Sequence, residues 1–352
     1  MGPIRDFIKR LANSRLDGFI ISSSSNLLYF TQFPNSEAYA LISSKGLVYF
    51  TDSRYAQSAR ESLRGIFSIE ITKGLVFQEI AKYCIDYGLK RIGFEERHMP
   101  YAEYKKIKEY LNSKALLIPT FGVIEGLRLV KKEPELTKIR KALKITGLAV
   151  SFIKDLIKPE AREIGLAAEL ERFIRYQGAK ASAFDIIVAS GPNSAYPHHS
   201  PTNKLISNDT NLLIDMGVDY LGYKSDLTRV FFLGKINSLY RRIYAIVLKA
   251  QELAIKKIRP GVKASVIDKI SRKYIEDKGY GKYFAHGLGH GIGLDVHEGP
   301  NISPKGEEIL REGMVFTVEP AIYLPGKFGV RLEDMVLVIK NGCEVLSGAI
   351  NK

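Results

Sequence analysis

The first third of the chain alternates short apolar runs with amphipathic helical patterns. Apolar runs predict strands at 17–22, 39–43, 46–50, 67–71, 91–95 and 114–119. Apolar residues spaced three and four apart predict helices at 53–63, 77–88 and 101–112. This alternation predicts an α/β domain with its own core. Its polar positions show no catalytic grouping, and His98 is its only histidine.

The pattern changes between residues 125 and 135, where Pro134 lies in the first turn of a predicted helix. Long amphipathic patterns predict helices at 135–157, 162–178, 238–258 and 264–279, and an apolar run predicts a strand at 183–190. A chain of 352 residues is long enough for two domains. We therefore expect an α/β (α+β) fold with two domains, residues 1–128 and residues 129–352.

Residues 212–232, LLIDMGVDYLGYKSDLTRVFF, consist of two apolar, β-rich runs around a tight-turn composition at Asp219–Gly222. A register that pairs Asp219 with Gly222 also pairs Asp215 with Asp226, and places their Cβ atoms about 4.5–5.5 Å apart. Like charges at that distance destabilise a hairpin unless a cation or a shared proton lies between them. A slipped register or an exposed acidic pair is the alternative.

Residues 313–340, GMVFTVEPAIYLPGKFGVRLEDMVLVIK, again form two β-rich runs, here around Pro325-Gly326. Glu319 and Glu333 lie at equal distances along the chain from Gly326. A hairpin centred on this glycine therefore presents a second pair of facing carboxylates.

A glycine-rich segment between the two hairpins carries three of the six histidines of the chain, His286, His290 and His297. Four carboxylates and a histidine make a hard, oxygen-rich ligand set. Such a set is suited to two divalent cations about 3.5–4 Å apart.

Composition and charge narrow the classes of partner. No run approaches the roughly 18 apolar residues of a membrane span, and the charged N-terminus lacks the apolar core of a signal peptide. The only cysteines, Cys84 and Cys343, lie outside any CxxC motif, which favours a reducing cytoplasm. The net charge is +14, but the lysines and arginines are scattered along the predicted amphipathic helices and form no nucleic-acid recognition motif. We expect a cytoplasmic protein with neither a membrane nor a nucleic-acid partner.

The motifs LLIDMGVDYLGYKSDLTRVF, GHGIGLDVHEGP, MVFTVEPAIYL and GVRLEDMVLV occur in this order, and together they resemble the pita-bread metallopeptidases, specifically aminopeptidase P and prolidase. In the N-terminal part, NLLYFTQF, YFTDSRYAQSAR and LVKKEPELTKIRKA are similar to the creatinase-like accessory domain of that family and its junction. The resemblance thus covers essentially the whole chain. It implies a C-terminal pita-bread catalytic domain and a homodimer.

The resemblance also implies roles for individual residues. The metal ligands are Asp215, Asp226, His290, Glu319 and Glu333, with Asp226 and Glu333 bridging two divalent cations. His198 and His297 are implied to act on the substrate carbonyl, and His286, Tyr323 and Arg331 to bind substrate. Carboxylate-rich ligation favours Mn²⁺, while Co²⁺, Fe²⁺ and Zn²⁺ are compatible with it. Of the two adjacent histidines we favour His198 as the functional one, with His199 as its neighbour. For Arg331, the alternative to a substrate-binding role is an ion pair with Glu333 or Asp334.

These roles agree with elementary chemistry. Two cations held by these ligands would lower the pKa of a bound water, Glu319 could take the proton of that water, and His198 and His297 could donate to the developing oxyanion. The leaving nitrogen of an Xaa-Pro bond has no N–H. Proteases that recognise that donor lose a contact there, whereas a metal site that polarises the carbonyl does not need it.

Asn301 separates two versions of this activity. Many relatives carry an arginine at this place, within HExPRIS, and in prolidases it helps to hold the carboxylate of the dipeptide. Asparagine carries no charge and cannot form the bidentate fork of a guanidinium. We therefore expect an aminopeptidase P activity on peptides with proline at the second position, with prolidase activity on dipeptides as the alternative.

Three other classes of protein with this fold agree less well with the sequence. A methionine aminopeptidase shares the metal ligands but normally lacks so long an accessory domain. Creatine amidinohydrolase shares the fold but lacks the ligands. Non-enzymatic, peptide-binding relatives typically lose some of the five ligands that this chain keeps.

Overall fold

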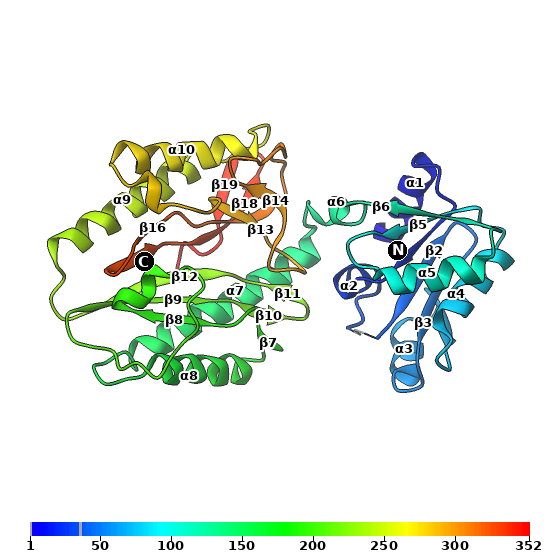
Figure 1. Ribbon diagram of the computed structural model, residues 1–352, viewed down its shortest axis with the longest axis horizontal. Helices are drawn as coiled ribbons and strands as arrows, with labels where there is room; N and C mark the ends of the chain where they lie inside the picture. Colours follow the sequence, from blue (N-terminus) through cyan, green and yellow to red (C-terminus); the bar gives the residue numbers. More distant parts are fainter. Residues whose placement is uncertain (1, 35–36) are drawn as a thin grey trace. The chain divides into compact units, whose positions relative to one another are not determined.

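The computed structural model describes residues 2–34 and 37–352. The chain divides into two compact units, Met1–Arg128 and Leu129–Lys352 (Figure 1). Among the described residues, no helix has the length and apolar character needed to cross a membrane.

The first unit is built on one mixed sheet with the strand order β4-β3-β2-β1-β5-β6. The strands are β1 (Gly18–Ile21), β2 (Tyr39–Ser43), β3 (Leu47–Thr51), β4 (Ser68–Ile71), β5 (Arg91–Glu95) and β6 (Leu116–Thr120). The helices are α1 (Gly2–Asn13), α2 (Ser24–Thr31), α3 (Ala56–Ser62), α4 (Val76–Asp86), α5 (Tyr101–Leu111) and α6 (Glu125–Arg128). All six predicted strands and all three predicted helices of this part are confirmed, whereas α1, α2 and α6 were not predicted.

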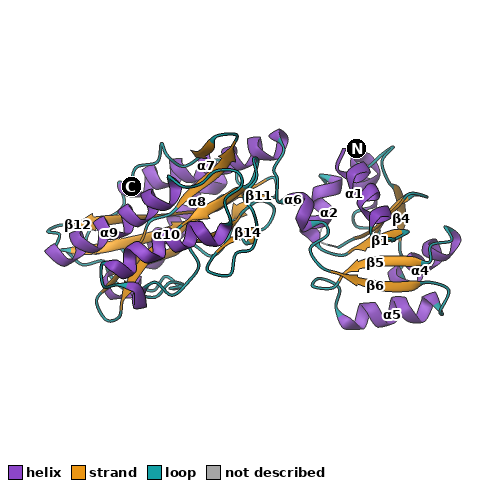
Figure 2. Cartoon of the chain, turned by 90° about the horizontal axis from the view of Figure 1, so that it is seen from above, coloured by secondary structure: helices purple, strands orange, loops and turns teal. Residues whose placement is uncertain are grey.

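Alternation along the central strand explains why helices cover both faces of this sheet. Ile20 packs in a cluster with Ile80 of α4 and Ile107 of α5. Phe19 points to the opposite face, where its ring lies 5.2 Å from that of Phe7 in α1. Figure 2 shows the strands between α1 and α2 on one side and α5 on the other.

The second unit holds four long helices, α7 (Glu133–Lys154), α8 (Glu163–Tyr176), α9 (Ser238–Ile255) and α10 (Ala264–Asp277). Its sheets have the orders β12-β9-β8, β11-β10-β7, β14-β13-β15-β18-β19 and β16-β17. Figure 1 shows α9 and α10 on one side of the strands and α7 and α8 on the other. Two apolar clusters correspond to these two layers.

The strands of this unit have between two and seven residues. They are β7 (Ala181–Ser182), β8 (Ile187–Ser190), β9 (Thr210–Met216), β10 (Val218–Tyr220), β11 (Tyr223–Lys224), β12 (Leu227–Leu233), β13 (Gly289–Gly291), β14 (Glu298–Ile302), β15 (Val315–Val318), β16 (Ala321–Leu324), β17 (Phe328–Arg331), β18 (Asp334–Ile339) and β19 (Gly342–Val345). Two 3-10 turns, η1 (Gly191–Ala195) and η2 (Gly281–Tyr283), connect them to loops that reach the site.

The predicted register of the first hairpin is wrong. Asp215 pairs with Thr228 in the β9–β12 ladder, so it does not face Asp226 directly. The two-residue turn at its tip consists of Leu221 and Gly222, with φ of 51° and 88°. Positive φ at both central residues is the signature of a type I′ turn. This turn lies one residue later than the composition suggested. Because Asp226 and Thr228 are two residues apart, we infer that Asp226 lies diagonally from Asp215 on the same face.

The predicted register of the second hairpin is confirmed by the residue pairs that flank Glu319 and Glu333 in the two strand ladders. Val318 pairs with Asp334 in the β15–β18 ladder, and Ala321 pairs with Arg331 in the β16–β17 ladder. Both ladders are symmetric about Gly326, whose φ is 71°. Glu319 and Glu333 thus occupy equivalent places in the gap between the two ladders.

Candidate active site and metal centre

A cavity of about 830 Å³ lies in the second unit. Five carboxylates and five histidines line it, and four of the carboxylates come from the two hairpins. The histidines come from the loop before the first hairpin and from the segment between the two hairpins. All ten residues that the sequence singled out for metal binding, catalysis or substrate binding line this cavity: Asp215, Asp226, His290, Glu319, Glu333, His198, His297, His286, Tyr323 and Arg331. Asn301 and His199 line it as well.

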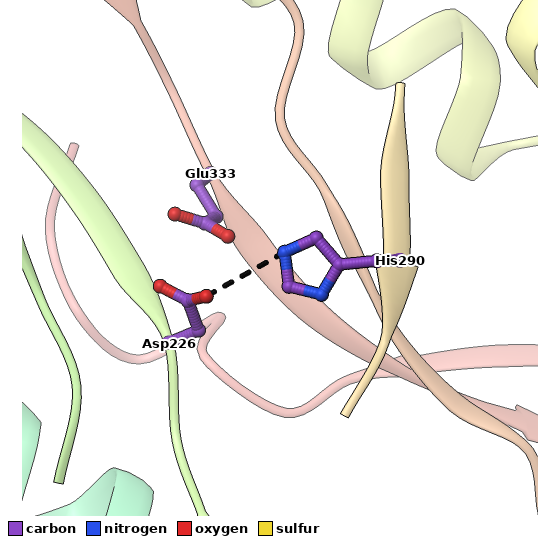
Figure 3. Close-up of side chains that lie close together, drawn as sticks. All are labelled: Asp226, His290 and Glu333. Atoms are coloured by element: carbon purple, nitrogen blue, oxygen red, sulfur yellow. Dashed lines mark ion pairs between the residues drawn. The ribbon is translucent and has the colours of Figure 1, made fainter. Parts of the chain in front are cut away.

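Asp226, His290 and Glu333 form its tightest cluster. Each offers one ligand atom, and these atoms lie within 4.8 Å of one another (Figure 3). Asp226 directly precedes β12, His290 is in β13, and Glu333 directly precedes β18. The Nε2 atom of His290 lies 3.6 Å from Asp226 Oδ2, a separation that suits two ligands each about 2 Å from a shared cation.

Glu319 lies against the same histidine. Its Oε1 atom is 3.2 Å from His290 Nε2 and accepts a hydrogen bond from the Thr317 hydroxyl at 3.1 Å. Burial raises the pKa of Glu319, but the hydrogen bond and charge of His290 outweigh that effect and hold the pKa at about 2. Glu319 is therefore ionised at neutral pH.

Asp215 is engaged differently. Its Oδ2 atom lies 2.5 Å from Arg331 Nη2, so a guanidinium and not His290 is its partner. Arg331 is itself buried and also donates to the Tyr323 hydroxyl at 2.6 Å and to the Thr228 hydroxyl at 3.0 Å. The structure thus leaves Asp215 outside the three-residue cluster, although it lines the same cavity.

The electrostatics of the cavity fit a cation. Burial, and after it repulsion by the neighbouring carboxylates, raises the pKa values of Asp226 and Glu333 well above their usual range. Among the described residues, the buried Oδ1 of Asp215 and Oε1 of Glu333 have no hydrogen-bond partner. Buried oxygens of this kind are costly unless a partner satisfies them. Divalent cations bound by these oxygens would supply that partner, and the hard donor set is one that such cations prefer.

The histidines surround the carboxylates. The rings of His290 and His297 are 4.3 Å apart in an edge-to-face arrangement, and burial and the neighbouring His290 lower the pKa of His297. His286 Nε2 lies 3.2 Å from the Tyr323 hydroxyl, and burial lowers the pKa of His286. His198 is exposed at the cavity, whereas His199 lies 2.9 Å from Glu163.

Three residues with a part in this geometry were missed in the sequence. The Thr228 hydroxyl donates to Glu333 Oε2 at 2.7 Å, and a correct register of the first hairpin would have found it opposite Asp215. Lys131 forms a buried ion pair at 2.8 Å with Glu298, the residue that follows His297. Glu163 is fully buried. Lys131 precedes α7 and Glu163 begins α8, and charged residues at such positions usually face solvent, so no local signal marks them.

Models of known families match both parts of the chain. The model of metallopeptidase family M24 matches residues 137–340, and the model of the creatinase/prolidase N-terminal domain matches residues 3–130. The chain belongs to metallopeptidase family M24. It is therefore a metallopeptidase, and the predicted resemblance is confirmed.

Members of the family align along nearly the whole chain. An Xaa-Pro dipeptidase of Pyrococcus horikoshii is 36% identical over 346 residues, which cover 98% of this chain and 96% of the relative. The solved structure of an Xaa-Pro dipeptidase from Bacillus anthracis has a TM-score of 0.96 at 37% identity, covering 100% of this chain and 98% of that one. An X-Pro aminopeptidase structure from Thermotoga maritima has a TM-score of 0.88 at 37% identity, with coverage of 95% and 96%. These structures confirm the predicted fold class. Dipeptidases and an aminopeptidase both occur among these relatives.

Proposed function

We propose that this protein is a metallo-exopeptidase that removes the N-terminal residue from peptides with proline at the second position. The observation that carries the proposal is the convergence of Asp226, His290 and Glu333 in a cavity that His198 and His297 also line. The relatives named for Xaa-Pro hydrolysis support the substrate class.

Asp215, Asp226, His290, Glu319 and Glu333 would hold two divalent cations. When bound, such cations lower the pKa of a water molecule and polarise the substrate carbonyl. Asp215 would bind a cation through its Oδ1 atom while its Oδ2 atom stays paired with Arg331. The Oδ1 atom is available because only Oδ2 contacts the guanidinium.

The protein's own groups then move protons and orient the substrate. Glu319 is ionised and would accept the proton that the attacking water loses, and would pass it to the leaving nitrogen as the carbon–nitrogen bond breaks. His198 and His297 donate hydrogen bonds to the carbonyl oxygen as negative charge develops on it. His286, Tyr323 and Arg331 form a connected wall that holds the substrate in place.

Asn301 supports a preference for peptides longer than two residues. It pairs with His290 across the β13–β14 ladder, is exposed, and lines the cavity. An uncharged residue next to the metal ligands offers no counter-ion for a free carboxylate one residue beyond the cleaved bond. Prolidase activity on dipeptides is the second candidate, because several relatives are named dipeptidases.

The test compares Ala-Pro with Ala-Pro-Ala on protein that has been stripped of metal and reloaded with Mn²⁺, Co²⁺, Fe²⁺ or Zn²⁺. We expect a higher kcat/KM for Ala-Pro-Ala, and an Asn301→Arg variant should move the ratio toward the dipeptide. Asn301→Asp is the matched control, since a carboxylate repels the dipeptide terminus. A tenfold preference of the wild type for Ala-Pro would make the protein a prolidase, and no hydrolysis with any metal would refute the whole proposal.

We further propose Mn²⁺ as the native metal, a cytoplasmic location and a homodimer. The carboxylate-rich donor set supports Mn²⁺, and the two cysteines, both free, support a reducing compartment. Metal analysis of protein purified without added metal, cell fractionation and analytical ultracentrifugation test the three statements separately.

A further inference from the structure

The loop that carries His198 is tied to a buried carboxylate outside the cavity lining. Glu163 is the first residue of α8 and is 0% exposed. Its Oε1 atom accepts hydrogen bonds from the Ser190 N–H at 2.8 Å, the Ser190 hydroxyl at 2.8 Å and the Asn193 amide at 3.0 Å. Its carboxylate thus engages the start of the loop.

The other oxygen of the same carboxylate engages the end of the loop. Glu163 Oε2 accepts from the Thr202 N–H at 3.2 Å and from the Thr202 hydroxyl at 2.8 Å, and it lies 2.9 Å from His199 Nε2. Main-chain bonds add to this link, since the Ile164 N–H donates to Thr202 O at 3.0 Å. One side chain therefore closes residues 190–202 into a fixed loop.

The two adjacent histidines of this loop have different surroundings. His199 has a side chain that is 12% exposed and is bound to Glu163. His198 is exposed and lines the cavity, and among the described residues its ring has no hydrogen-bond partner. The contact of His199 with the Glu163 carboxylate thus fixes the backbone on which His198 is presented.

The charge of Glu163 suits this task. Burial raises the pKa of Glu163, but hydrogen bonds from His199, Ser190 and Thr202 outweigh it and hold the pKa at about 2. An ionised carboxylate forms stronger and shorter hydrogen bonds than a neutral amide. A glutamine at this position would keep the volume, lose the charge and turn one acceptor into a donor that faces other donors.

We propose that Glu163 is a positioning residue, which acts through His199 to hold His198 in the geometry needed for hydrolysis. The inference rests on the proposed role of His198. A carboxylate that serves only the stability of the fold would lower the amount of folded protein without a specific effect on turnover.

The experiment is a double-mutant cycle of Glu163→Gln and His198→Ala on Mn²⁺-loaded full-length protein. Partners that orient an active group are typically worth on the order of 10–100-fold. We therefore expect Glu163→Gln to lower kcat by that factor, with KM and metal content near wild type. In the His198→Ala background the same change should cost less than about twofold, because the two residues act as a unit.

Glu169→Gln is the matched control, because Glu169 lies on the same helix, has a side chain that is 41% exposed, and pairs with Arg172. It should leave kcat unchanged. His199→Gln, which keeps a donor toward Glu163, and His199→Ala, which removes it, test the same link if Glu163→Gln does not fold. We expect His199→Gln to keep more activity than His199→Ala.

The possible failures are distinguishable. A wild-type kcat in His198→Ala would overturn the proposed role of His198 and this inference with it. A lowered kcat in His198→Ala, together with an undiminished effect of Glu163→Gln in that background, would overturn only the positioning role. Equal activities of His199→Gln and His199→Ala would overturn it as well.

Discussion

The two carboxylate-bearing hairpins present their acidic residues in different ways. In the β15–β18 hairpin, Glu319 and Glu333 occupy symmetric places about Gly326. In the β9–β12 hairpin, Asp226 joins the cluster of His290 and Glu333, while Asp215 is bound by Arg331. Asp226 lies two residues from Thr228, the cross-strand partner of Asp215, whereas Glu319 and Glu333 occupy equivalent places on their two strands. Four acidic groups can thus share one cavity without all facing each other.

The largest expected effect comes from Asp226→Ala. Asp226 is the only residue of the β9–β12 hairpin in the three-residue cluster among the described residues, so its loss should remove metal and activity together. We expect kcat/KM to fall by at least about 10³-fold, since the metal supplies several kcal/mol of transition-state stabilisation. Metal content by mass spectrometry and Ala-Pro-Ala hydrolysis measure the two losses. Full activity with one metal or none bound would contradict this assignment.

His198→Ala and His297→Ala leave both hairpins intact. We expect each to lower kcat by roughly 10²–10⁴-fold, the range for a lost proton-transfer or oxyanion group. Metal content should stay near wild type, because neither residue is in the cluster with Asp226. Parallel kinetics and metal analysis check this result. Loss of metal in His297→Ala would move His297 into the ligand set.

Thr228→Val tests the contact between the hairpins. The hydroxyl of Thr228 donates to Glu333 and accepts from Arg331, and the side chain is fully buried. Valine keeps the shape but leaves two buried polar groups without this partner, so the free energy of unfolding should fall by about 1–3 kcal/mol. Urea unfolding of metal-free protein measures it. Thr137→Val, at an exposed position of α7, is the control and should change the value by less than about 0.5 kcal/mol.

The smallest effect concerns the turn of the first hairpin. Leu221 is 60% exposed and has a φ of 51°, a conformation that leucine adopts at a cost. Asparagine tolerates this conformation and favours the first central position of a type I′ turn. Leu221→Asn should therefore raise the free energy of unfolding by about 0.5–1 kcal/mol with unchanged kcat. A lower thermal midpoint would contradict the register described here.

The two hairpins differ in how well their turns can be predicted from the sequence. Pro325-Gly326 marks the centre of the second hairpin correctly, because its glycine supplies the positive φ that the turn needs. In the first hairpin, the polar composition of Asp219–Gly222 suggested a centre one residue too early. The turn contains an apolar Leu221 at positive φ, which no propensity predicts.

The fold class and the residues of the site could be predicted from the sequence, because both rest on local hydrophobic patterns or on motifs shared with the family. The strands of the first unit follow from apolar runs, and the lining of the cavity follows from motifs. The roles of Glu163 and Lys131 were not accessible, since both depend on partners 27–39 and 167 positions away in the sequence. A charged residue before a helix or in its first turn is usually solvated, and only the tertiary structure shows that these two are buried.

The ties of Lys131 have a consequence for the order in which the protein is assembled. Its N–H donates to Gly313 O at 2.8 Å, and its ammonium group binds Glu298 at 2.8 Å. Lys131 at the beginning of the second unit therefore reaches these partners only after residues 298 and 313 have been synthesised, and Glu333 follows later still. The first unit has its sheet complete by residue 120 and can form during synthesis. Because Glu333 belongs to the three-residue cluster, a cation can be held by all three of its side chains only after residue 333 has left the ribosome.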